Sequence, residues 1–351
     1  MRVWGVIIAG GIGERLWPLS REKFPKQMLC LGEEKPLIEA AIERIVPLCG
    51  KNSILILTSQ LLKGLLEKAL PDIPKENIMG EPCRKNTGPA IGFAAYWIEK
   101  NFGEGVMVIL PSDHFIKDKE KFIKVLSKGI HAAESSNSLV TVGITPERPE
   151  TGYGYIEKGE MIENGIWRVR RFIEKPNLEK AREFTSSPSF LWNSGMLIGK
   201  TSTILKNIEI FLPSILQGLK EIFQGKKTLE EVYPTFPDIS MDYGVLEKAK
   251  DVLMVEGDFF WDDVGNWLAM ERIMRKDKVG NVKKGLTVTL DSQDLIIWGA
   301  QDKLIATLGI KNLVIVDTPD ALMVIEKSRA QEVKKILAQL KKEKEKFKKY
   351  I

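Results

Sequence analysis

The sequence predicts an α/β protein with a parallel sheet, followed by a small β-rich module. In the first 145 residues, short apolar runs alternate with amphipathic stretches, which is the pattern of β-α-β units. After residue 280, short apolar runs recur about every nine residues with polar turns between them. A chain of 351 residues can hold two such domains, and we expect them to cover residues 1–280 and 281–351.

The first domain is expected to contain four buried strands separated by helices. The strand-like runs are 3–9 (VWGVIIA), 53–58, 105–111 and 138–144, and the helical stretches are 36–46, 60–70, 88–100 and 119–134. Ligands of parallel sheets bind where the strands end. The segments 9–16, 81–89 and 111–114 all follow strand-like runs, so they should share one site. From about 150 to 275 the pattern is mixed, which favours a second substrate region around the same sheet.

The β-rich module should be a few coils of a β-solenoid, ending in an amphipathic helix. Its apolar runs are 286–291, 295–299, 304–309, 313–318 and 321–327. The helix places an apolar row on one face: Val333, Ile336, Leu337, Leu340 and Phe347. Either this module or a second subunit must cover that row. We expect a homodimer formed largely through the C-terminal region, with the active site elsewhere.

Composition excludes several classes of protein. The chain is 44% hydrophobic and 28% charged, with no apolar run near the roughly 20 residues that span a bilayer and no signal-peptide pattern. We therefore expect a cytoplasmic protein without a membrane partner. Three cysteines without C-x-x-C spacing and two histidines make thiolate and multi-histidine metal sites improbable, so oxygen ligands and Mg²⁺ are expected. Much of the net charge of +5 lies in residues 341–350, which fits a solvated helix face rather than nucleic-acid binding.

A glycine-rich turn, AGGIGERL at 9–16, follows the first strand-like run. It is not a dinucleotide-binding fingerprint, because Leu16 stands where glycine or alanine is needed, and it lacks the G-K-[ST] of a P-loop. Glycines let backbone N–H groups approach anionic oxygens, and Arg15 and Lys26 add positive charge nearby. Together they predict a phosphate-binding turn.

The segment GGIGERLWPLSREKFPKQ resembles the signature of nucleotidyltransferases that make nucleotide sugars, in particular mannose-1-phosphate guanylyltransferases. Ordered motifs along almost the whole chain share this resemblance: EPCRKNTGPAI, LPSDHFI, RPETGYGYIE, RFIEKP, WNSGML, SMDYGVLEK, FFWDDVGNW and VIVDTPDALMVIEK. It implies a Rossmann-like mixed sheet of the glycosyltransferase A type. It also implies transfer of GMP from GTP to mannose 1-phosphate with release of pyrophosphate. The isomerase half of bifunctional relatives is not expected here.

The resemblance implies a role for individual residues. Arg15 and Lys26 are the expected catalytic pair on the triphosphate, with Arg21 and Lys23 as less certain neighbours. Asp113 and Asp263 are expected to hold Mg²⁺, with Asp262 as the rival of Asp263. The nucleotide site is expected to comprise Gly10, Gly11, Gly13, Glu81, Asn86, Thr87, Ser112 and Asp113. The sugar-phosphate site is expected to comprise Tyr153, Gly154, Glu174, Lys175 and Asn193.

Simpler interpretations remain open for some of these residues. Asn86 or Thr87 would also make a good N-cap for the helix that follows, and Asp242 could cap a helix rather than touch a ligand. A sister enzyme that uses another nucleotide or sugar 1-phosphate is the nearest rival for the function. A regulatory homologue without activity is a second one, although Arg15, Lys26, Asp113 and Asp263 are all present.

Overall fold

The computed structural model describes all 351 residues. The chain forms two compact units that interleave along the sequence. Unit 1 comprises Met1–Gly10, Ala41–Ser112 and Ile116–Phe260, and unit 2 comprises Gly11–Ala40, Asp113–Phe115 and Trp261–Ile351. The glycine-rich segment and residues 113–115 group with the C-terminal module in unit 2, and the domain boundary expected at residue 280 stays a prediction.

Unit 1 is built on a nine-stranded mixed sheet with the order β3-β2-β1-β4-β9-β6-β10-β8-β7. Its strands are β1 (Arg2–Ile8), β2 (Ile54–Ser59), β3 (Ile78–Glu81), β4 (Gly105–Pro111), β6 (Leu139–Ile144), β7 (Tyr155–Glu163), β8 (Ile166–Ile173), β9 (Phe190–Lys200) and β10 (Val252–Gly257). Strands β1, β2 and β4 pair in parallel, as the sequence predicts, and β3, which is not among the expected runs, joins them in parallel beside β2. The sheet is mixed, since β9 lies antiparallel between β4 and β6.

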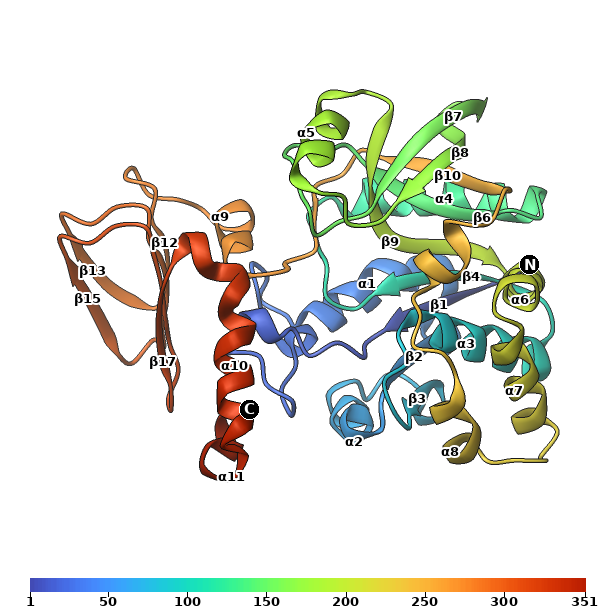
Figure 1. Ribbon diagram of the computed structural model, residues 1–351, viewed down its shortest axis with the longest axis horizontal. Coiled ribbons are helices and arrows are strands. Elements are labelled where there is room, and N and C mark those ends of the chain that lie inside the picture. Colours follow the sequence, from blue (N-terminus) through green and yellow to red (C-terminus); the bar gives the residue numbers. More distant parts are fainter. The chain divides into compact units, whose positions relative to one another are not determined.

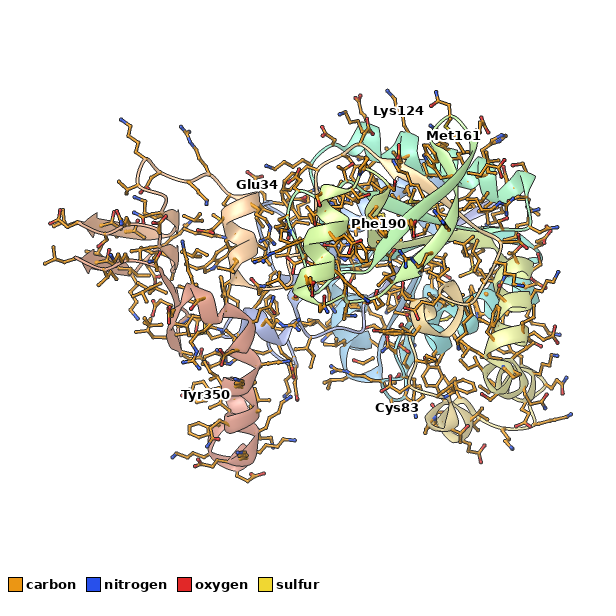
Figure 2. All side chains as sticks on the ribbon, turned by 45° about the horizontal axis from the view of Figure 1, so that its top comes forward. Glu34, Cys83, Lys124, Met161, Phe190 and Tyr350 are labelled. Atoms are coloured by element: carbon orange, nitrogen blue, oxygen red, sulfur yellow. The ribbon has the colours of Figure 1, made fainter.

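Helices cover both faces of this sheet (Figure 1). They are α1 (Leu37–Cys49), α2 (Gln60–Ala69), α3 (Thr87–Phe102), α4 (Lys119–Ser135), α5 (Leu178–Ser186), α6 (Thr201–Phe211), α7 (Pro213–Phe223) and α8 (Leu229–Val232). Helices α3, α6 and α7 pack together over a core that includes Trp4, Leu57 and Ile208, all nearly inaccessible to solvent. Helix α4 packs on β6, β9 and β10. Near α5, Phe190 at the start of β9 stacks on Phe184 (Figure 2).

The parallel strands place candidate site residues at one edge of the sheet. Ile8 pairs with Leu57 and with Pro111, and Ser59 pairs with Glu81, so β1 to β4 all end at the same edge. The backbone N–H of Ser112 donates to the carbonyl of Ile8, 3.1 Å away. Gly10, Glu81 and Ser112 therefore leave the sheet side by side, as expected for a ligand edge.

Unit 2 contains the predicted β-solenoid. Strands β12 (Val282–Lys284), β14 (Ile296–Trp298) and β16 (Leu313–Asp317) stack in parallel, and β17 (Leu322–Glu326) closes that sheet antiparallel. Strands β13 (Leu286–Leu290) and β15 (Leu304–Leu308) form a second parallel layer. Two short strands, β5 (Phe115–Ile116) and β11 (Trp261–Asp262), and helix α9 (Met270–Ile273) complete the strands and helices that precede this module.

The terminal helix differs from its prediction. Helix α10 (Val333–Lys342) ends where Glu343 leaves the helical region with φ −112° and ψ 48°, and Phe347 belongs to the separate helix α11 (Lys344–Phe347). The expected apolar row therefore does not run as one face to Phe347. Val333 and Leu337 are buried within unit 2, where α10 packs against the 3-10 turn Glu14–Leu16. No helix in the structure combines the length and apolar character needed to cross a bilayer.

Candidate active site

The structure groups the expected site residues into two clusters, one in each unit. Unit 2 holds Gly11, Gly13, Arg15, Lys26, Asp113 and Asp263, which form the phosphate cluster. Unit 1 holds Gly10, Glu81, Asn86, Thr87, Ser112 and all five expected sugar-site residues. The chain joins the two groups directly at the peptide bonds Gly10–Gly11 and Ser112–Asp113.

Lys26 is the centre of the phosphate cluster. Its ammonium lies 2.8 Å from Asp113 Oδ2 and donates a short hydrogen bond to the main-chain carbonyl of Asp263. The side chain is almost fully buried, so it is held by these partners rather than by solvent. Burial favours the neutral acid of Asp113, but the nearby charges of Lys26 and His114 outweigh it and lower the carboxyl pKa. The cluster thus presents an ionised carboxylate beside a fixed cation.

The glycine turn explains how Lys26 reaches this position. Gly13 has φ +76°, which a residue with a side chain rarely adopts, and a Cβ there would lie 2.3 Å from Lys26 Cβ. The backbone N–H of Lys26 donates to the carbonyl of Ile12, 2.9 Å away, which closes the turn. Arg15 projects from the same turn and is exposed. Around Gly11, a Cβ would meet no atom within 4 Å, so its backbone is open to approach.

The two neighbouring aspartates differ in their surroundings. Asp262 is 1% exposed and receives hydrogen bonds from the guanidinium of Arg272, at 2.9 Å from Nη2 and closer from Nε. Its Oδ1 also accepts from the N–H of Val264 at 2.8 Å. By contrast, Asp263 accepts from the N–H of Gly265 at 3.0 Å, and its carbonyl faces Lys26. Asp262 is therefore engaged as the partner of an arginine.

In unit 1, Glu81 lies at the end of β3 in a largely apolar setting. Burial raises the pKa of its carboxyl group to about 7, although the hydroxyl of Tyr233, which donates to Oε1, and the charge of Arg84 both oppose the rise. The other oxygen faces Gly10, where a Cβ would lie 3.5 Å from Oε2. The sequence analysis missed Tyr233, since no local pattern links residues that lie 152 positions apart.

Asn86 and Thr87 both serve the fold. Asn86 is the N-cap of α3, with φ +64°, and its side-chain oxygen accepts from the N–H of Thr87 at 3.0 Å. Thr87 Oγ1 accepts from the N–H of Met241 at 2.8 Å. The simpler N-cap interpretation of Asn86 is therefore observed. The amide NH₂ of Asn86 and the hydroxyl proton of Thr87 are not used in these bonds.

The five expected sugar-site residues are close together. The N–H groups of Lys175 and Asn193 donate to the carbonyls of Tyr153 and Gly154, at 3.2 and 2.8 Å. A Cβ at Gly154 would lie 2.4 Å from Glu174 Oε2, so only glycine leaves room for this carboxylate. The ammonium of Lys175 binds Glu174 through a short contact. Asn193, on β9, is buried. Its backbone N–H bonds to Gly154, and its side-chain amide bonds to Asp242.

Asp242 joins this cluster instead of capping a helix. Its Oδ1 accepts from the side-chain amide of Asn193 at 2.9 Å, and it starts the π-helical turn Asp242–Leu246. Burial and the charge of Glu174 raise the pKa of Asp242 to about 6. The sequence pattern is compatible with a helix cap or a ligand contact at Asp242, and the structure shows its carboxylate bonded to Asn193.

Backbone strain coincides with these motifs. Asn86, Lys175 and Val264 have φ values of +64°, +47° and +49°, in the left-handed region that non-glycine residues avoid. Valine is β-branched, and Val264 is fully buried between the two turns formed by Asp262 and Asp263. A strained backbone conformation of this kind persists where several surrounding contacts hold it in place, and such residues are common at functional sites.

The C-terminal region contacts the glycine-rich loop. Lys341 Nζ lies 3.0 Å from Glu14 of the glycine turn, and Tyr350 accepts a hydrogen bond from Trp17, while the expected dimer stays a prediction. Both contacts lie within unit 2.

Comparison with known proteins identifies the family of both domains. Residues 4–279 match the nucleotidyl transferase family model, and residues 285–340 match the mannose-phosphate isomerase/GMP-like beta-helix domain. A mannose-1-phosphate guanylyltransferase of Escherichia coli is 35% identical over 95% of this chain and 75% of its own length. The xanthan biosynthesis protein XanB of Xanthomonas campestris is 36% identical over 96% of this chain and 73% of its own length.

A solved structure is similar over almost the entire chain. It is described as a mannose-1-phosphate geranyltransferase from Thermus thermophilus, with a TM-score of 0.90 and 36% identity, and covers 97% of this chain and 100% of that one. The nucleotidyl transferase domain and the β-solenoid therefore both have counterparts in known proteins. This chain belongs to the mannose-1-phosphate guanylyltransferase family of nucleotidyl transferases.

Proposed function

We propose that this protein transfers GMP from GTP to mannose 1-phosphate and releases pyrophosphate. The observation that carries the proposal is the phosphate cluster, in which Lys26 meets Asp113 and Asp263 beneath a glycine turn bearing Arg15. Release of pyrophosphate, measured for each of the four NTPs with several sugar 1-phosphates, tests it. GTP with mannose 1-phosphate should be the preferred pair. Preference for another pair would indicate the sister-enzyme alternative, and no release from any pair would indicate an inactive homologue.

Chemistry of this kind needs few catalytic groups. A sugar phosphate is already an anionic nucleophile near neutral pH, since its second pKa is about 6. The obstacle is the approach of one anion to the α-phosphate of another. In this proposal Lys26 and Arg15 neutralise the triphosphate and hold it in line, and the open backbone at Gly11 contacts its oxygens, while Gly13 forms the turn against Lys26.

The donor set fits a hard cation. Asp113 contacts the Lys26 ammonium through its carboxylate and Asp263 contacts it through its main-chain carbonyl, and the Asp263 carboxylate offers a second set of hard oxygen donors. We therefore assign Mg²⁺ to Asp113 and Asp263 and not to Asp262, whose carboxylate is engaged by Arg272. When bound, such a metal would supply Lewis-acid charge to phosphate oxygens.

Unit 1 supplies recognition in this proposal. Glu81 accepts from the N1–H and amino group of guanine, and Asn86 or Thr87 donates to O6 with the protons left free by their structural bonds. Ser112, next to Asp113, is assigned to the nucleotide site. Lys175 meets the sugar phosphate, and Glu174 and Asn193 bind sugar hydroxyls, with Tyr153 and Gly154 shaping the pocket. We add Asp242 to this set because it binds Asn193.

Two further parts of the proposal concern the molecule as a whole. The three cysteines are free thiols, which supports a reducing cytoplasmic location. Residues 1–280 would hold the transferase motifs, while the solenoid carries an exposed apolar stripe that supports a homodimer. This stripe consists of paired residues on β13 and β15: Leu286, Val288, Leu290, Leu304, Ala306 and Leu308. A surface of this kind is uncommon on a monomer.

Removing the cationic side chain of Lys26 or Arg15 should slow the reaction without unfolding the protein. We predict that Lys26→Ala and Arg15→Ala each lower kcat by about 10²–10³-fold, the scale of a lost charge-stabilising donor. Lys278→Ala, which removes an exposed lysine elsewhere in unit 2, is the control and should leave kcat nearly unchanged. Steady-state pyrophosphate release and circular dichroism measure both properties. A folded Lys26→Ala enzyme with near-normal kcat would refute the assignment of Lys26 to the triphosphate.

The metal assignment predicts different responses at the two adjacent aspartates. Asp113→Asn and Asp263→Asn should each raise the Mg²⁺ concentration at half-maximal activity, because each removes one anionic ligand. Asp262→Asn should chiefly lower stability, since it leaves Arg272 partly buried with a weakened partner. Activity titrated against Mg²⁺, together with thermal unfolding, separates them. A raised Mg²⁺ midpoint for Asp262→Asn alone would reverse the assignment.

Recognition through Glu81 predicts a pH dependence of GTP binding. Guanine donors need the ionised carboxylate, whose pKa in the free protein is about 7. Protonation below that value competes with GTP, so affinity should increase as pH rises from about 6 to about 8 and level off above the pKa. Calorimetric GTP titrations measure this for the native protein and for Glu81→Gln. Titration of the γ-phosphate is common to both, so identical pH profiles would exclude Glu81 from base recognition.

The dimer proposal predicts that a charge in the apolar stripe separates the subunits. Leu308, 69% exposed, is replaced in Leu308→Glu, which should give a monomer by light scattering at micromolar concentration. The control is Ile210→Glu on α6, where an equally apolar side chain is 58% exposed in unit 1. That variant should stay dimeric. A native protein that is monomeric under these conditions would contradict the proposal.

A further inference from the structure

The last residues of the chain bind the glycine-rich loop through their main-chain carbonyls. The indole N–H of Trp17 donates to the carbonyl of Tyr350 at 2.7 Å, and Arg21 Nη1 donates to the carbonyl of Lys349 at 2.9 Å. Ile351 is itself buried. The loop and the tail (residues 341–351, with Tyr350 labelled in Figure 2) belong to the same unit. Residues 349 and 350 therefore accept hydrogen bonds from the loop that bears Arg15.

A second contact comes from the turn after β16. Both terminal nitrogens of Arg21 bind Asp320, Nη1 at 2.8 Å to Oδ2 and Nη2 at 2.6 Å to Oδ1. Bidentate pairs of this kind are among the stronger and most directional charged hydrogen bonds in proteins. The hydrogen bond from Arg21 lowers the pKa of Asp320 to about 2, so the pair stays charged over the working pH range. Arg21 also lies 5.9 Å from the centre of the Tyr350 ring.

These contacts act on a short, internally bonded loop. Ser20 Oγ donates to the carbonyl of Gly13 at 2.6 Å, and the N–H of Leu16 donates to the same carbonyl at 2.9 Å. On its far side, Trp17 accepts at its carbonyl from the indole N–H of Trp267, 3.1 Å away. Arg15 is exposed between Gly13 and Trp17, so its direction depends on how those two residues are held.

We propose that Arg21, Asp320 and the tail form a positioning device that holds the glycine-rich loop, and with it Arg15, in the geometry needed for phosphate transfer. Arg21 is then a positioning residue, since its guanidinium is occupied by Asp320 and Lys349 instead of projecting like Arg15. Lys341, 3.0 Å from Glu14, adds a weaker tie at the other end of the turn. The expected effect on catalysis rests on the proposed transferase function. The expected effect on the structure of the loop does not.

Two variants weaken the device in different ways. Asp320→Asn keeps the shape of the side chain and removes its charge. Deletion of Lys349–Ile351 removes carbonyl acceptors that no side-chain substitution can remove. We expect kcat to fall about tenfold or more in each, as for a slightly misplaced catalytic group, while KM for GTP changes by less than about threefold. Hydrogen exchange of amides 11–24 should be faster, with the global thermal transition almost retained. Lys346→Ala, which removes an ion pair with Glu343 and a ring contact with Phe347, both inside the tail, should change none of these.

Hydrogen exchange separates this proposal from the transferase assignment. If the native protein releases no pyrophosphate from GTP and mannose 1-phosphate, the assignment fails, but faster exchange of the loop in both variants would still support the device. Unchanged loop exchange in both variants would overturn it. A loss of kcat that follows global unfolding in both variants would overturn it as well, because the tail would then serve only stability.

Discussion

The burial of one ammonium group organises the phosphate cluster. Lys26 lies where the glycine turn, the residues after β4 and the residues after β11 meet within unit 2, and it contacts Asp113 and the carbonyl of Asp263. An unpaired buried lysine would be costly, so these partners must be in place for the chain to fold this way. Gly13 is required because any side chain there would collide with Lys26. The same requirement for folding thus assembles the cationic and anionic groups that phosphate chemistry uses.

Unit 1 contains two candidate site carboxyl groups that burial makes weakly acidic. Glu81 and Asp242 are carboxyl groups whose ionisation is disfavoured by burial, and each is held by one named partner, Tyr233 and Asn193. The segments that bear them also touch. The N–H of Gly88 donates to the carbonyl of Ile239 at 2.9 Å, which connects the motif around Asn86 with the motif around Asp242. The motifs proposed for base and for sugar recognition are therefore parts of one hydrogen-bonded structure.

Local sequence patterns were sufficient for β1, β2, β4 and β6 and for helices α1 to α4, because periodicity records which face is buried, but they missed the short strand β3. They could not place β9 between β4 and β6, since strand order depends on contacts between distant segments. The family motifs brought Glu174, Lys175 and Asn193 together correctly as a group, although their roles stay predictions. Tyr233 and the contact of Trp17 with Tyr350 were missed for one reason: partners 152 and 333 residues apart leave no periodic trace. The adjacent Asp262 and Asp263 could be separated only by seeing Arg272.

In this account every charged group of the site binds, orients or neutralises, and none becomes covalently attached to the nucleotide. The sugar phosphate attacks the α-phosphorus directly and pyrophosphate leaves from the opposite side. The stereochemical course of the reaction tests this claim most directly, with GTP made chiral at the α-phosphorus by sulfur substitution and mannose 1-phosphate as acceptor. A single in-line displacement predicts inversion of configuration in the GDP-mannose thio analogue. Retention would require two displacements through a nucleotidylated side chain, and would contradict the account.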